Sequence, residues 1–476
     1  MNMNHLIIMI IIILVIWNKY YSTIILYIYI IMSKNSIHSY DDITDKDLDD
    51  ICSDFNPFPT VIPHQQRIIA IGDIHGDMNL AINFLKKAKL IKEVCKTNIN
   101  EMTTTEYKYQ LQITNKLNLE TKMENFDLEK NNGNLVYRYY KSDNEFYVKI
   151  IQESNNPNDV STDEEKQTKC KLYDVDRWFK WIGKDTYVVQ VGDQVDRCRP
   201  YGEHTCNLED ATKNDEDSDL EIMLFYDSLD KIAIESGSGG RVFSLLGNHE
   251  IMNIGGDMRY VSNKGIKEYS PEPKDYVQGL GIRKNVFKKI ISRKMACTRS
   301  TVLIIGDYLF VHGGIANKLA YKYKLVDINL IIKKFLLSFK SNEDVNFILH
   351  SSKSSPLWYR QLAYIPEDRN GKRDKNCSVV FDPIVKNINT NNPTIQIKGM
   401  VIGHTPQFSV FGKGITTACN NSIIRVDIGA STAFDIFSTN IKSTNPNVDI
   451  QKAREPQVVE IITDLTTKES TVQILI

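Results

Sequence analysis

Five short polar motifs, each directly after a run of apolar residues, constrain the fold of this chain more than any other feature. The apolar runs RIIAI, YVVQV, RVFSLL, YLFV and KGMVI have the length and composition of buried strands. The motifs that follow them are Gly72–Asp77, Gly192–Arg197, Gly247–Glu250, Val311–Gly314 and Gly403–Pro406. Open α/β sheets place their chemistry at the carboxyl ends of strands, so we expect these polar side chains to form one site at a sheet edge.

The motifs supply Asp, His and Asn side chains, a mixture that hard or borderline divalent metals prefer. A hydrolytic centre of two ions, roughly 3.5–4 Å apart, needs ligands for each ion and one group that bridges them. The residues that we expect to hold the ions are Asp73 and His75 on one side, Asp193 as the bridge, and Asn248, His312 and His404 on the other.

Three residues beside these ligands have the chemistry of catalysis. His249 follows Asn248 and could protonate a leaving group as a general acid. Asp196 could orient His249 and raise its proton affinity. Arg197 offers a planar fork that suits two phosphoryl oxygens. We therefore expect an acid pair and a phosphate ligand next to the metals.

Composition limits the partners and the compartment. The 476 residues include 58 basic and 59 acidic side chains, so no global field favours nucleic acid, and we expect no nucleic-acid partner. The eight cysteines form no CxxC pair and no dense framework. This pattern argues against a disulfide-stapled secreted domain and favours a reducing, intracellular compartment.

The amino-terminal segment, residues 1–32, is hydrophobic. Its two apolar runs, Leu6–Trp17 and Ile24–Met32, are each shorter than the roughly 20 residues that span a bilayer. Two interpretations stand first, that residues 6–32 are a membrane anchor or that they lie upstream of a true start at Met32, and a secretion signal stands behind both. Residues 33–65 are a polar leader, and residues 66–476 form one catalytic domain.

Two polar insertions interrupt this domain, at about 96–172 and 202–219. The first contains β-like pieces at 107–114, 134–141 and 145–152, and a hairpin turn is expected between the last two. A helix is expected after the first strand, from about residue 80, and another over about 220–236.

The five motifs resemble those of the calcineurin-like metallophosphoesterases, and more narrowly the phosphoprotein phosphatase (PPP) family. GDIHGD, GDQVDR, GNHE and VHGG match its ordered signature, and GHTP stands where its last metal histidine lies. The segments LLGNHEIMN, GGDMRYVS, SSPLWYR and RVDIGASTAF look like the Shewanella-like protein phosphatases. The similarity covers roughly residues 66–464, apart from the insertions.

The resemblance implies an α/β fold, a four-layer αββα sandwich with two stacked mixed sheets. It implies hydrolysis of phosphomonoesters by direct attack of a metal-bridging hydroxide, without a phosphoenzyme. Manganese is the favoured metal, with iron or zinc as alternatives. The resemblance implies these roles: Asp73, His75 and Asp193 for the first ion; Asp193, Asn248, His312 and His404 for the second; His249 with Asp196 as the acid pair; and Arg197 with Asn248 for the phosphate.

The family also uses a second phosphate-binding arginine, for which Arg360 is the candidate, with Arg259 behind it. Cys198 stands where the family has glycine, and either the loop is altered or a thiol beside the site is open to oxidation. The expected substrate is a phosphorylated protein or peptide. Two other functions remain open, namely hydrolysis of dinucleoside polyphosphates or cyclic nucleotides, and a non-catalytic binding module.

Overall fold

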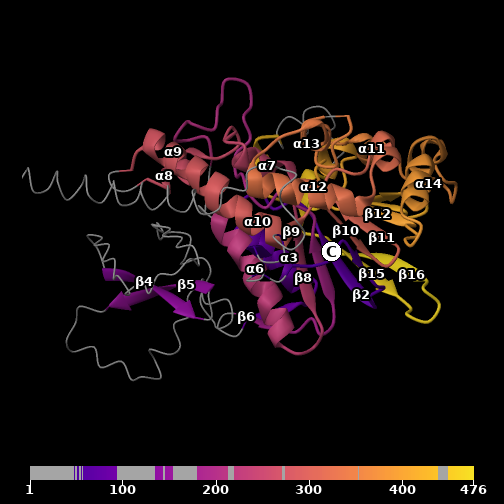
Figure 1. Ribbon diagram of the computed structural model, residues 1–476, viewed down its shortest axis with the longest axis horizontal. Helices are drawn as coiled ribbons and strands as arrows, with labels where there is room; N and C mark the ends of the chain where they lie inside the picture. The colour runs from indigo at the N-terminus through magenta and orange to yellow at the C-terminus, as the bar shows by residue number, and fades with distance from the viewer. Residues whose placement is uncertain are drawn as a thin grey trace, which may run out of the picture.

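A computed structural model describes residues 48, 51–52, 55, 57–93, 134–142, 145–153, 179–212, 219–270, 274–351, 353–437 and 449–476. Two six-stranded mixed sheets are stacked, and helices cover their outer faces (Figure 1). This is the α/β sandwich that the motifs led us to expect. The amino-terminal segment, residues 1–32, and most of the leader lie outside the described residues.

The first sheet has the strand order β1-β10-β11-β12-β14-β13. Strands β11, β12 and β14 run parallel to one another, whereas β10 and β13 are antiparallel to their neighbours β11 and β14. The strands are β1 (Val61–Ile62), β10 (Val302–Ile305), β11 (Tyr308–Val311), β12 (Gly399–Ile402), β13 (Thr416–Ala418) and β14 (Ile423–Arg425).

The second sheet has the order β16-β15-β2-β7-β8-β9, and β2, β7, β8 and β9 are parallel. Its strands are β2 (Arg67–Ile71), β7 (Tyr187–Gln190), β8 (Arg241–Leu245), β9 (Arg299–Ser300), β15 (Val458–Thr463) and β16 (Ser470–Leu475). The first sheet therefore presents three neighbouring parallel strands and the second sheet four, and the motifs follow strands of these two sets.

Alternation along the strands divides the apolar side chains between two cores. In β10, Leu303 and Ile305 join the cluster that fills the space between the sheets, while Val302 and Ile304 pack with the helices outside the first sheet. Successive side chains of a strand point to opposite faces, so a continuously apolar strand is one that is buried on both sides. The apolar runs of the sequence are thus explained by burial between layers.

Helices cover both sheets. Helices α3 (Met78–Lys87) and α6 (Asp219–Glu235) pack on the second sheet, and both are helices that the apolar spacing predicts. The first sheet is covered by residues of α10 (Ser292–Thr298), α11 (Asn317–Lys322), α12 (Leu325–Ser338), α13 (Glu343–Leu349) and α14 (Asp382–Asn391). The remaining α-helices are α7 (Asn248–Ile254), α8 (Asn263–Lys267), α9 (Tyr276–Val286), α15 (Gln407–Val410) and α17 (Ile450–Arg454).

Parts of the two insertions are described. Strands β4 (Asn134–Ser142) and β5 (Glu145–Glu153) pair antiparallel, as the expected hairpin requires. Strands β3 (Ile91–Glu93) and β6 (Phe179–Trp181) pair antiparallel at the two ends of the first insertion. The expected strand over 107–114 lies outside the described residues. In the second insertion, a short β-bridge joins Tyr201 and His204.

The cysteines correct an expectation. The six cysteines within the described residues form three disulfides, Cys52–Cys297, Cys198–Cys206 and Cys377–Cys419, with sequence separations of 245, 8 and 42 residues. Of the two alternatives for Cys198, the structure contradicts the free thiol, and the inference of a reducing compartment loses its support. Two of the three pairs join distant segments, and the spacing of cysteines along a chain carries no information on contacts between distant segments.

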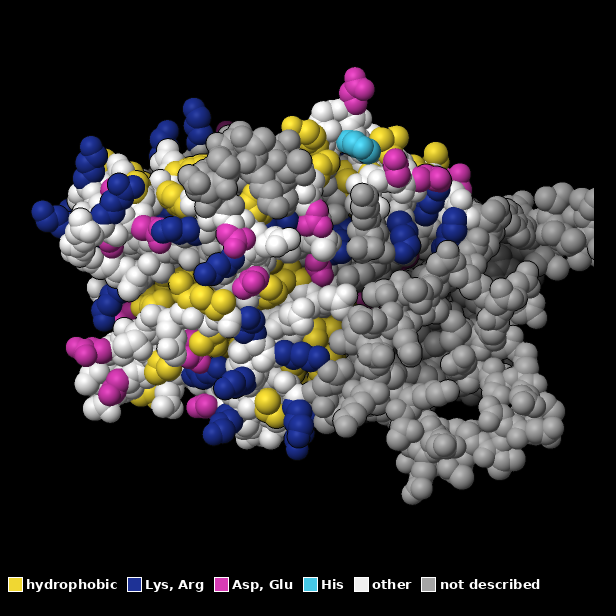
Figure 2. Space-filling view, turned by 180° about the vertical axis from the view of Figure 1, so that it is seen from behind, with side chains coloured by type: hydrophobic (Ala, Val, Ile, Leu, Met, Phe, Trp, Pro, Cys, Tyr) yellow, Lys and Arg dark blue, Asp and Glu magenta, His cyan; other side chains and the backbone are white. Residues whose placement is uncertain are grey.

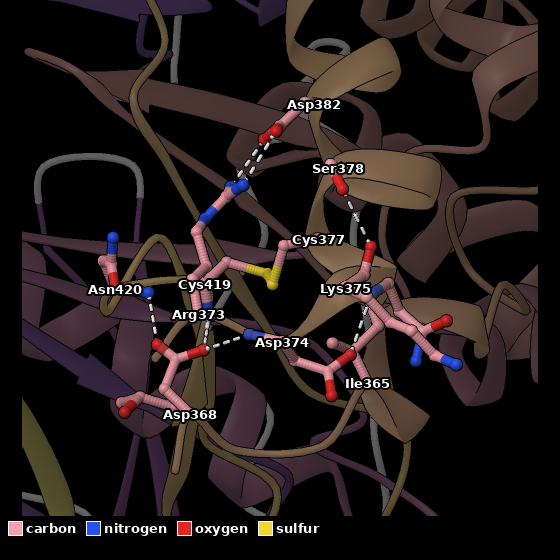
Figure 3. Close-up of a disulfide and its surroundings, with 12 residues drawn as sticks. Ile365, Asp368, Arg373, Asp374, Lys375, Cys377, Ser378, Asp382, Cys419 and Asn420 are labelled. Carbon is pink, nitrogen blue, oxygen red and sulfur yellow. Dashed lines mark hydrogen bonds and ion pairs between the residues drawn. A yellow bond between two sulfur atoms is a disulfide. The ribbon is translucent and has the colours of Figure 1, made fainter. Parts of the chain in front are cut away.

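The Cys377–Cys419 disulfide joins the helical segment before α14 to the β13–β14 hairpin (Figure 3). Around it, the Asp368 carboxylate accepts hydrogen bonds from the backbone N–H groups of Cys419 and Asn420, at 3.2 and 2.5 Å. The loop that precedes α14 is therefore held to the hairpin both covalently and by hydrogen bonds.

The face shown in Figure 2 carries interspersed basic and acidic side chains. This agrees with the near-zero net charge of −1. Among the residues that the structure describes, no helix has the length and apolarity needed to cross a bilayer.

Candidate metal centre

The predicted ligands lie together at the carboxyl ends of the two sets of parallel strands. Asp73 and His75 follow β2, Asp193 follows β7, and Asn248 begins α7 after β8. In the facing sheet, His312 follows β11 and His404 follows β12. Since β2 pairs with β7, β7 with β8, and β11 with β12, each sheet delivers its ligands side by side. All six side chains are buried.

Hydrogen bonds connect these strand ends. The backbone N–H groups of Ile74 and His75 both donate to the Asp193 carbonyl at 3.0 Å. Across the two sheets, the backbone N–H of His404 donates to an oxygen of the Asp73 carboxylate at 3.1 Å. The N–H of His249 donates to Asp193 Oδ1 at 3.0 Å. The loops are therefore tied to one another and not only to their own strands.

The ligand atoms form two clusters that share Asp193. His75 Nε2 lies 3.7 Å from Asp73 Oδ2 and 3.8 Å from Asp193 Oδ2. His312 Nε2 lies 3.1 Å from Asp193 Oδ2 and 3.0 Å from Asn248 Oδ1. The potential ligand atoms of Asp193, His312 and His404 all lie within 4.8 Å of one another. One carboxylate thus stands between two groups of donors, as a bridged pair of ions requires.

The backbone adopts uncommon conformations at these residues. His75, Asp193, Asp196 and His404 have positive φ angles of 49°, 55°, 76° and 66°. Non-glycine residues avoid this region, and such strain clusters at functional sites. Gly247 is required for a related reason, because a Cβ there would lie 2.1 Å from Asp193 Oδ1. The fold therefore holds the ligands in a geometry that the local chain does not favour.

The orientation of the histidines fits metal binding. Nδ1 of His75 lies 3.1 Å from the Val195 carbonyl, and Nδ1 of His312 lies 2.9 Å from the Val191 carbonyl. These contacts assign the proton to Nδ1 and leave the Nε2 lone pair toward Asp193, which is the usual arrangement of a ligating histidine. Nε2 of His404 is buried and has no hydrogen-bond partner in the described residues. A divalent ion would satisfy that atom, so the donor set fits the group.

The electrostatics of the site also favour a cation. Burial raises the pKa of Asp73 well above its ordinary value, and the negative charges of Asp427 and Asp193 raise it further. Burial lowers the pKa values of His75 and His404 well below the ordinary value. Neutral imidazoles beside crowded carboxylates are what a divalent ion needs, because its charge offsets that of the carboxylates.

The expected acid pair is in hydrogen-bond contact. His249 Nδ1 lies 2.6 Å from Asp196 Oδ2, and Asn253 Nδ2 donates to Asp196 Oδ1 at 2.7 Å. The Arg283 guanidinium lies 3.9 Å from the same Oδ1. His249 Nε2 lies 3.7 Å from Asp193 Oδ2, at the edge of the first cluster. Geometry alone would also allow His249 as a ligand, whereas the resemblance gives it the role of acid.

Arg197 connects the first two motifs. Its Nη1 lies 3.0 Å from Asp77 Oδ2 and donates to the Gly76 carbonyl at 3.2 Å. Asp77 in turn caps α3 by accepting from the Leu80 N–H at 3.0 Å. The side chain is 3% exposed. These contacts give Arg197 a structural function, and its role as a phosphate ligand stays a prediction.

The two candidates for a second arginine differ in position. Arg360 Nη1 donates to the His404 carbonyl at 2.8 Å and to Thr405 Oγ1 at 2.9 Å, so it lies beside the second cluster. Arg259 is exposed and pairs with Asp257 at 2.6 Å. The structure thus brings Arg360 to the site and leaves Arg259 paired at the surface.

Glu250, the last residue of the GNHE motif, has a function that the sequence analysis missed. Its Oε2 accepts from the backbone N–H groups of Gly247 and Asp193, at 2.7 and 2.9 Å. Its Oε1 accepts from the N–H of Gln194 at 2.8 Å. The carboxylate therefore fixes the turn that carries the bridging residue.

Asp427 is a second residue that the sequence analysis missed. It follows β14, the third parallel strand of the first sheet, and its Oδ1 accepts from the Gly429 N–H at 2.9 Å. Its Oδ2 is buried with no hydrogen-bond partner in the described part of the chain. Burial raises its pKa to about 6. A signal was present, since an acidic residue after an apolar strand, with a nearby glycine, repeats the layout of the five motifs.

Comparison with known proteins agrees with this geometry. The family model of the calcineurin-like phosphoesterases matches residues 66–408. An uncharacterized protein of Acanthamoeba polyphaga mimivirus is 34% identical over 239 residues, which cover 45% of this chain and 90% of the viral protein. Shewanella-like protein phosphatase 2 of Arabidopsis thaliana is 29% identical, over 54% of this chain and 65% of its own length.

A solved structure, the cold-active protein-tyrosine phosphatase of a psychrophilic Shewanella species, is also similar. Its TM-score is 0.43 at 16% identity, over 89% of this chain and 84% of that one. The family match and the phosphatase relatives support a metal-dependent phosphatase hydrolase. The matched residues include all five motifs, and the chain belongs to the calcineurin-like phosphoesterase family.

Proposed function

We propose that this protein is a phosphatase that depends on two divalent metal ions and hydrolyses phosphomonoesters, with phosphorylated proteins or peptides as substrates. The observation that carries the proposal is the pair of buried donor clusters that share Asp193. The protein substrate is supported by the names of the relatives, which include two Shewanella-like protein phosphatases.

In this proposal, Asp73, His75 and Asp193 hold one ion, and Asp193, Asn248, His312 and His404 hold the other. The ions would supply a water activated for direct attack and would offset the charge that develops on the phosphoryl oxygens. Manganese is the metal that we favour. The donor set would also accept iron or zinc.

The chain's own side chains supply the remaining steps. Asp196 holds Nδ1 of His249, so the proton that His249 can donate is on Nε2, which faces the cluster. Nε2 of His249 gives its proton to the leaving oxygen. The alcohol or phenol then departs from phosphorus as a neutral hydroxyl compound. Asn248 and Arg197 contact the phosphate, and Arg360, which bonds the loop of His404, is a further phosphate contact.

The test is to assay the purified chain on phosphopeptides carrying phosphoserine, phosphothreonine or phosphotyrosine, and on p-nitrophenyl phosphate, with added manganese, iron or zinc. Bound metal is measured in parallel by mass spectrometry. Dinucleoside polyphosphates and cyclic nucleotides are the comparison substrates. We expect turnover of phosphopeptides and two ions per chain.

Variants link the activity to the site. Asp193→Asn should lose both ions and activity, and His404→Ala should lose one ion. His350→Ala, which removes an exposed histidine at the end of α13, is the matched control and should change neither. Inertness toward phosphopeptides and p-nitrophenyl phosphate with every metal would overturn the proposal. Preference for the nucleotides would replace its substrate class.

A further inference from the structure

Arg199, two residues beyond the second motif, lies against two aromatic rings at the metal centre. Its guanidinium carbon is 4.6 Å from the ring centre of Phe434 and 5.5 Å from that of Tyr260. The Phe434 ring contacts His75, with ring centres 5.3 Å apart, and the Tyr260 ring contacts His249 at 4.8 Å. The guanidinium is thus placed beside the two histidines that flank Asp193.

The donors of Arg199 are only partly used. Nη1 donates to the carbonyls of Asp196 at 3.0 Å and Cys198 at 2.8 Å. Among the described residues, no acceptor is found for Nη2 or Nε, and no carboxylate lies at ion-pair distance. The side chain is half-buried, so these donors are not sealed in the core. A guanidinium has five N–H donors in a planar fork that suits phosphate.

The charge of Arg199 is in the field of the centre. Burial lowers the pKa of Arg199, while the carboxylates of Asp193 and Asp196 act in the opposite direction. The positive charge of Arg199 in turn adds to burial in lowering the pKa of His75. An arginine stays charged under these conditions. The positive charge of Arg199 would therefore attract an anion bound at the metal centre.

The backbone that carries Arg199 is held in place. Cys198 is joined to Cys206 by a disulfide, and its N–H donates to the Tyr260 carbonyl at 3.0 Å. The stacked rings and the two carbonyl acceptors restrict the side chain itself. Restricting a binding group in advance lowers the entropy lost when a ligand is bound. By contrast, Arg197 and Arg259 each contact a carboxylate.

We propose that Arg199 binds the phosphoryl group of the substrate, and inorganic phosphate after hydrolysis, through Nη2 and Nε. This proposal rests on the proposed phosphatase function, and it adds to Arg197 and Arg360 an arginine that the sequence analysis did not consider. The Cys198–Cys206 disulfide and the rings of Phe434 and Tyr260 are the elements that position it.

The test compares the wild type with Arg199→Ala and Arg199→Lys. The measurements are KM and kcat for p-nitrophenyl phosphate, the inhibition constant of inorganic phosphate, and bound metal. Arg241→Ala is the matched control, since Arg241 also stacks on a ring, that of Phe243 at 5.0 Å, but lies at the start of β8, at the opposite end of the strand from Asn248. Arg199→Gln, which keeps part of the stem, replaces the alanine variant if that variant does not fold.

We expect Arg199→Ala to raise both KM and the phosphate inhibition constant by about 10- to 100-fold, because the variant loses a pair of charge-assisted hydrogen bonds to the phosphate. For Arg199→Lys, both constants should lie between those of the wild type and those of Arg199→Ala. Bound metal should be unchanged in both variants, and the control Arg241→Ala should have the constants of the wild type. If Arg199→Ala keeps its bound metal and its phosphate inhibition constant changes by less than about twofold, the proposal is overturned. If the wild type hydrolyses no phosphomonoester, the proposed function fails separately, and calorimetric titration of inorganic phosphate into the metal-loaded protein still decides the role of Arg199.

Discussion

Arg283 is a fully buried charge whose removal should affect both stability and catalysis. It lies on α9 with 0% exposure, and its Nη2 donates to Asp219 Oδ2 at 2.7 Å. Its Nε and Nη2 both donate to Asn253 Oδ1, at 3.1 and 2.9 Å. Asp219 Oδ1 also accepts from the N–H of Asp196 at 2.9 Å. The acid pair is therefore supported by a buried network that extends to α9.

The substitution Arg283→Met keeps most of the volume and removes the charge. It leaves the Asp219 carboxylate buried without its cation and Asn253 Oδ1 without a donor. Breaking a buried ion pair from one side costs about 3–5 kcal/mol, and we expect a loss of that size in the free energy of unfolding. Adding Asp219→Asn removes the uncompensated charge, so the double variant should lose about 1–3 kcal/mol less than the sum of the single variants.

Urea unfolding at a fixed metal concentration measures this loss. The control is Arg373→Met, because the pair of Arg373 and Asp382 is solvent-accessible, with 30% and 47% side-chain exposure (Figure 3). An exposed pair contributes about 0–1 kcal/mol. Equal losses of less than about 1 kcal/mol for Arg283→Met and Arg373→Met would refute the argument from burial.

The same variant should change catalysis in a way that a loss of stability alone would not. The Arg283 guanidinium lies 3.9 Å from the carboxylate that holds His249. A disturbed acid pair matters most when the leaving group needs a proton, so kcat should fall more on phenyl phosphate than on p-nitrophenyl phosphate. A uniform fall on both substrates would show that the network does not serve proton donation.

Three further predictions follow from the site and its supports. His75→Ala should lose bound metal, whereas His249→Ala should keep it and lose activity. Mass spectrometry of the bound metals separates a ligand from an acid, and equal metal loss would make His249 a ligand. In the metal-free protein, the contribution of Asp427 to stability should fall as pH rises from about 4 to 6, against the opposite contributions of His75 and His404, whose pKa values burial lowers. The reason is that Asp427 ionises near 3.8 in the unfolded chain and near 6 when folded, so only the unfolded chain releases its proton in that window. Asp427→Asn should remove this contribution to the pH dependence of the free energy of unfolding, measured by urea unfolding at several pH values. An unchanged slope of that free energy against pH would exclude Asp427 as a cause. Cys377→Ser should lower the free energy of unfolding by up to about 4 kcal/mol, because the disulfide closes a separation of 42 residues. A melting temperature equal to that of the wild type would show that the hydrogen bonds around Asp368 suffice.

Much of the fold follows from contacts that are local in the sequence. The strand β2 and the helix α3 were predicted from apolar alternation and helical spacing, since each pattern repeats within a few residues. The hairpin of β4 and β5 was predicted from two β-like runs around a short polar turn. The six predicted ligands lie together because each directly follows a strand, and parallel neighbours end at one edge.

The sequence, through its motifs and the resemblance that they carry, therefore predicted the sandwich and the five strand-end loops, and it named six candidate ligands that the fold brings together. The tertiary structure alone decided what surrounds them. Asp73 meets the His404 loop across 331 residues, and Arg283 reaches Asp219 across 64. Cysteines separated by 245 residues are paired. These contacts depend on how the two sheets and α9 stack, and the local pattern of a chain carries no record of that stacking. For that reason the positions of Arg199 and Arg283 beside the site became visible only in the folded molecule, whereas Asp427 follows an apolar strand and carried a local signal that the sequence analysis missed.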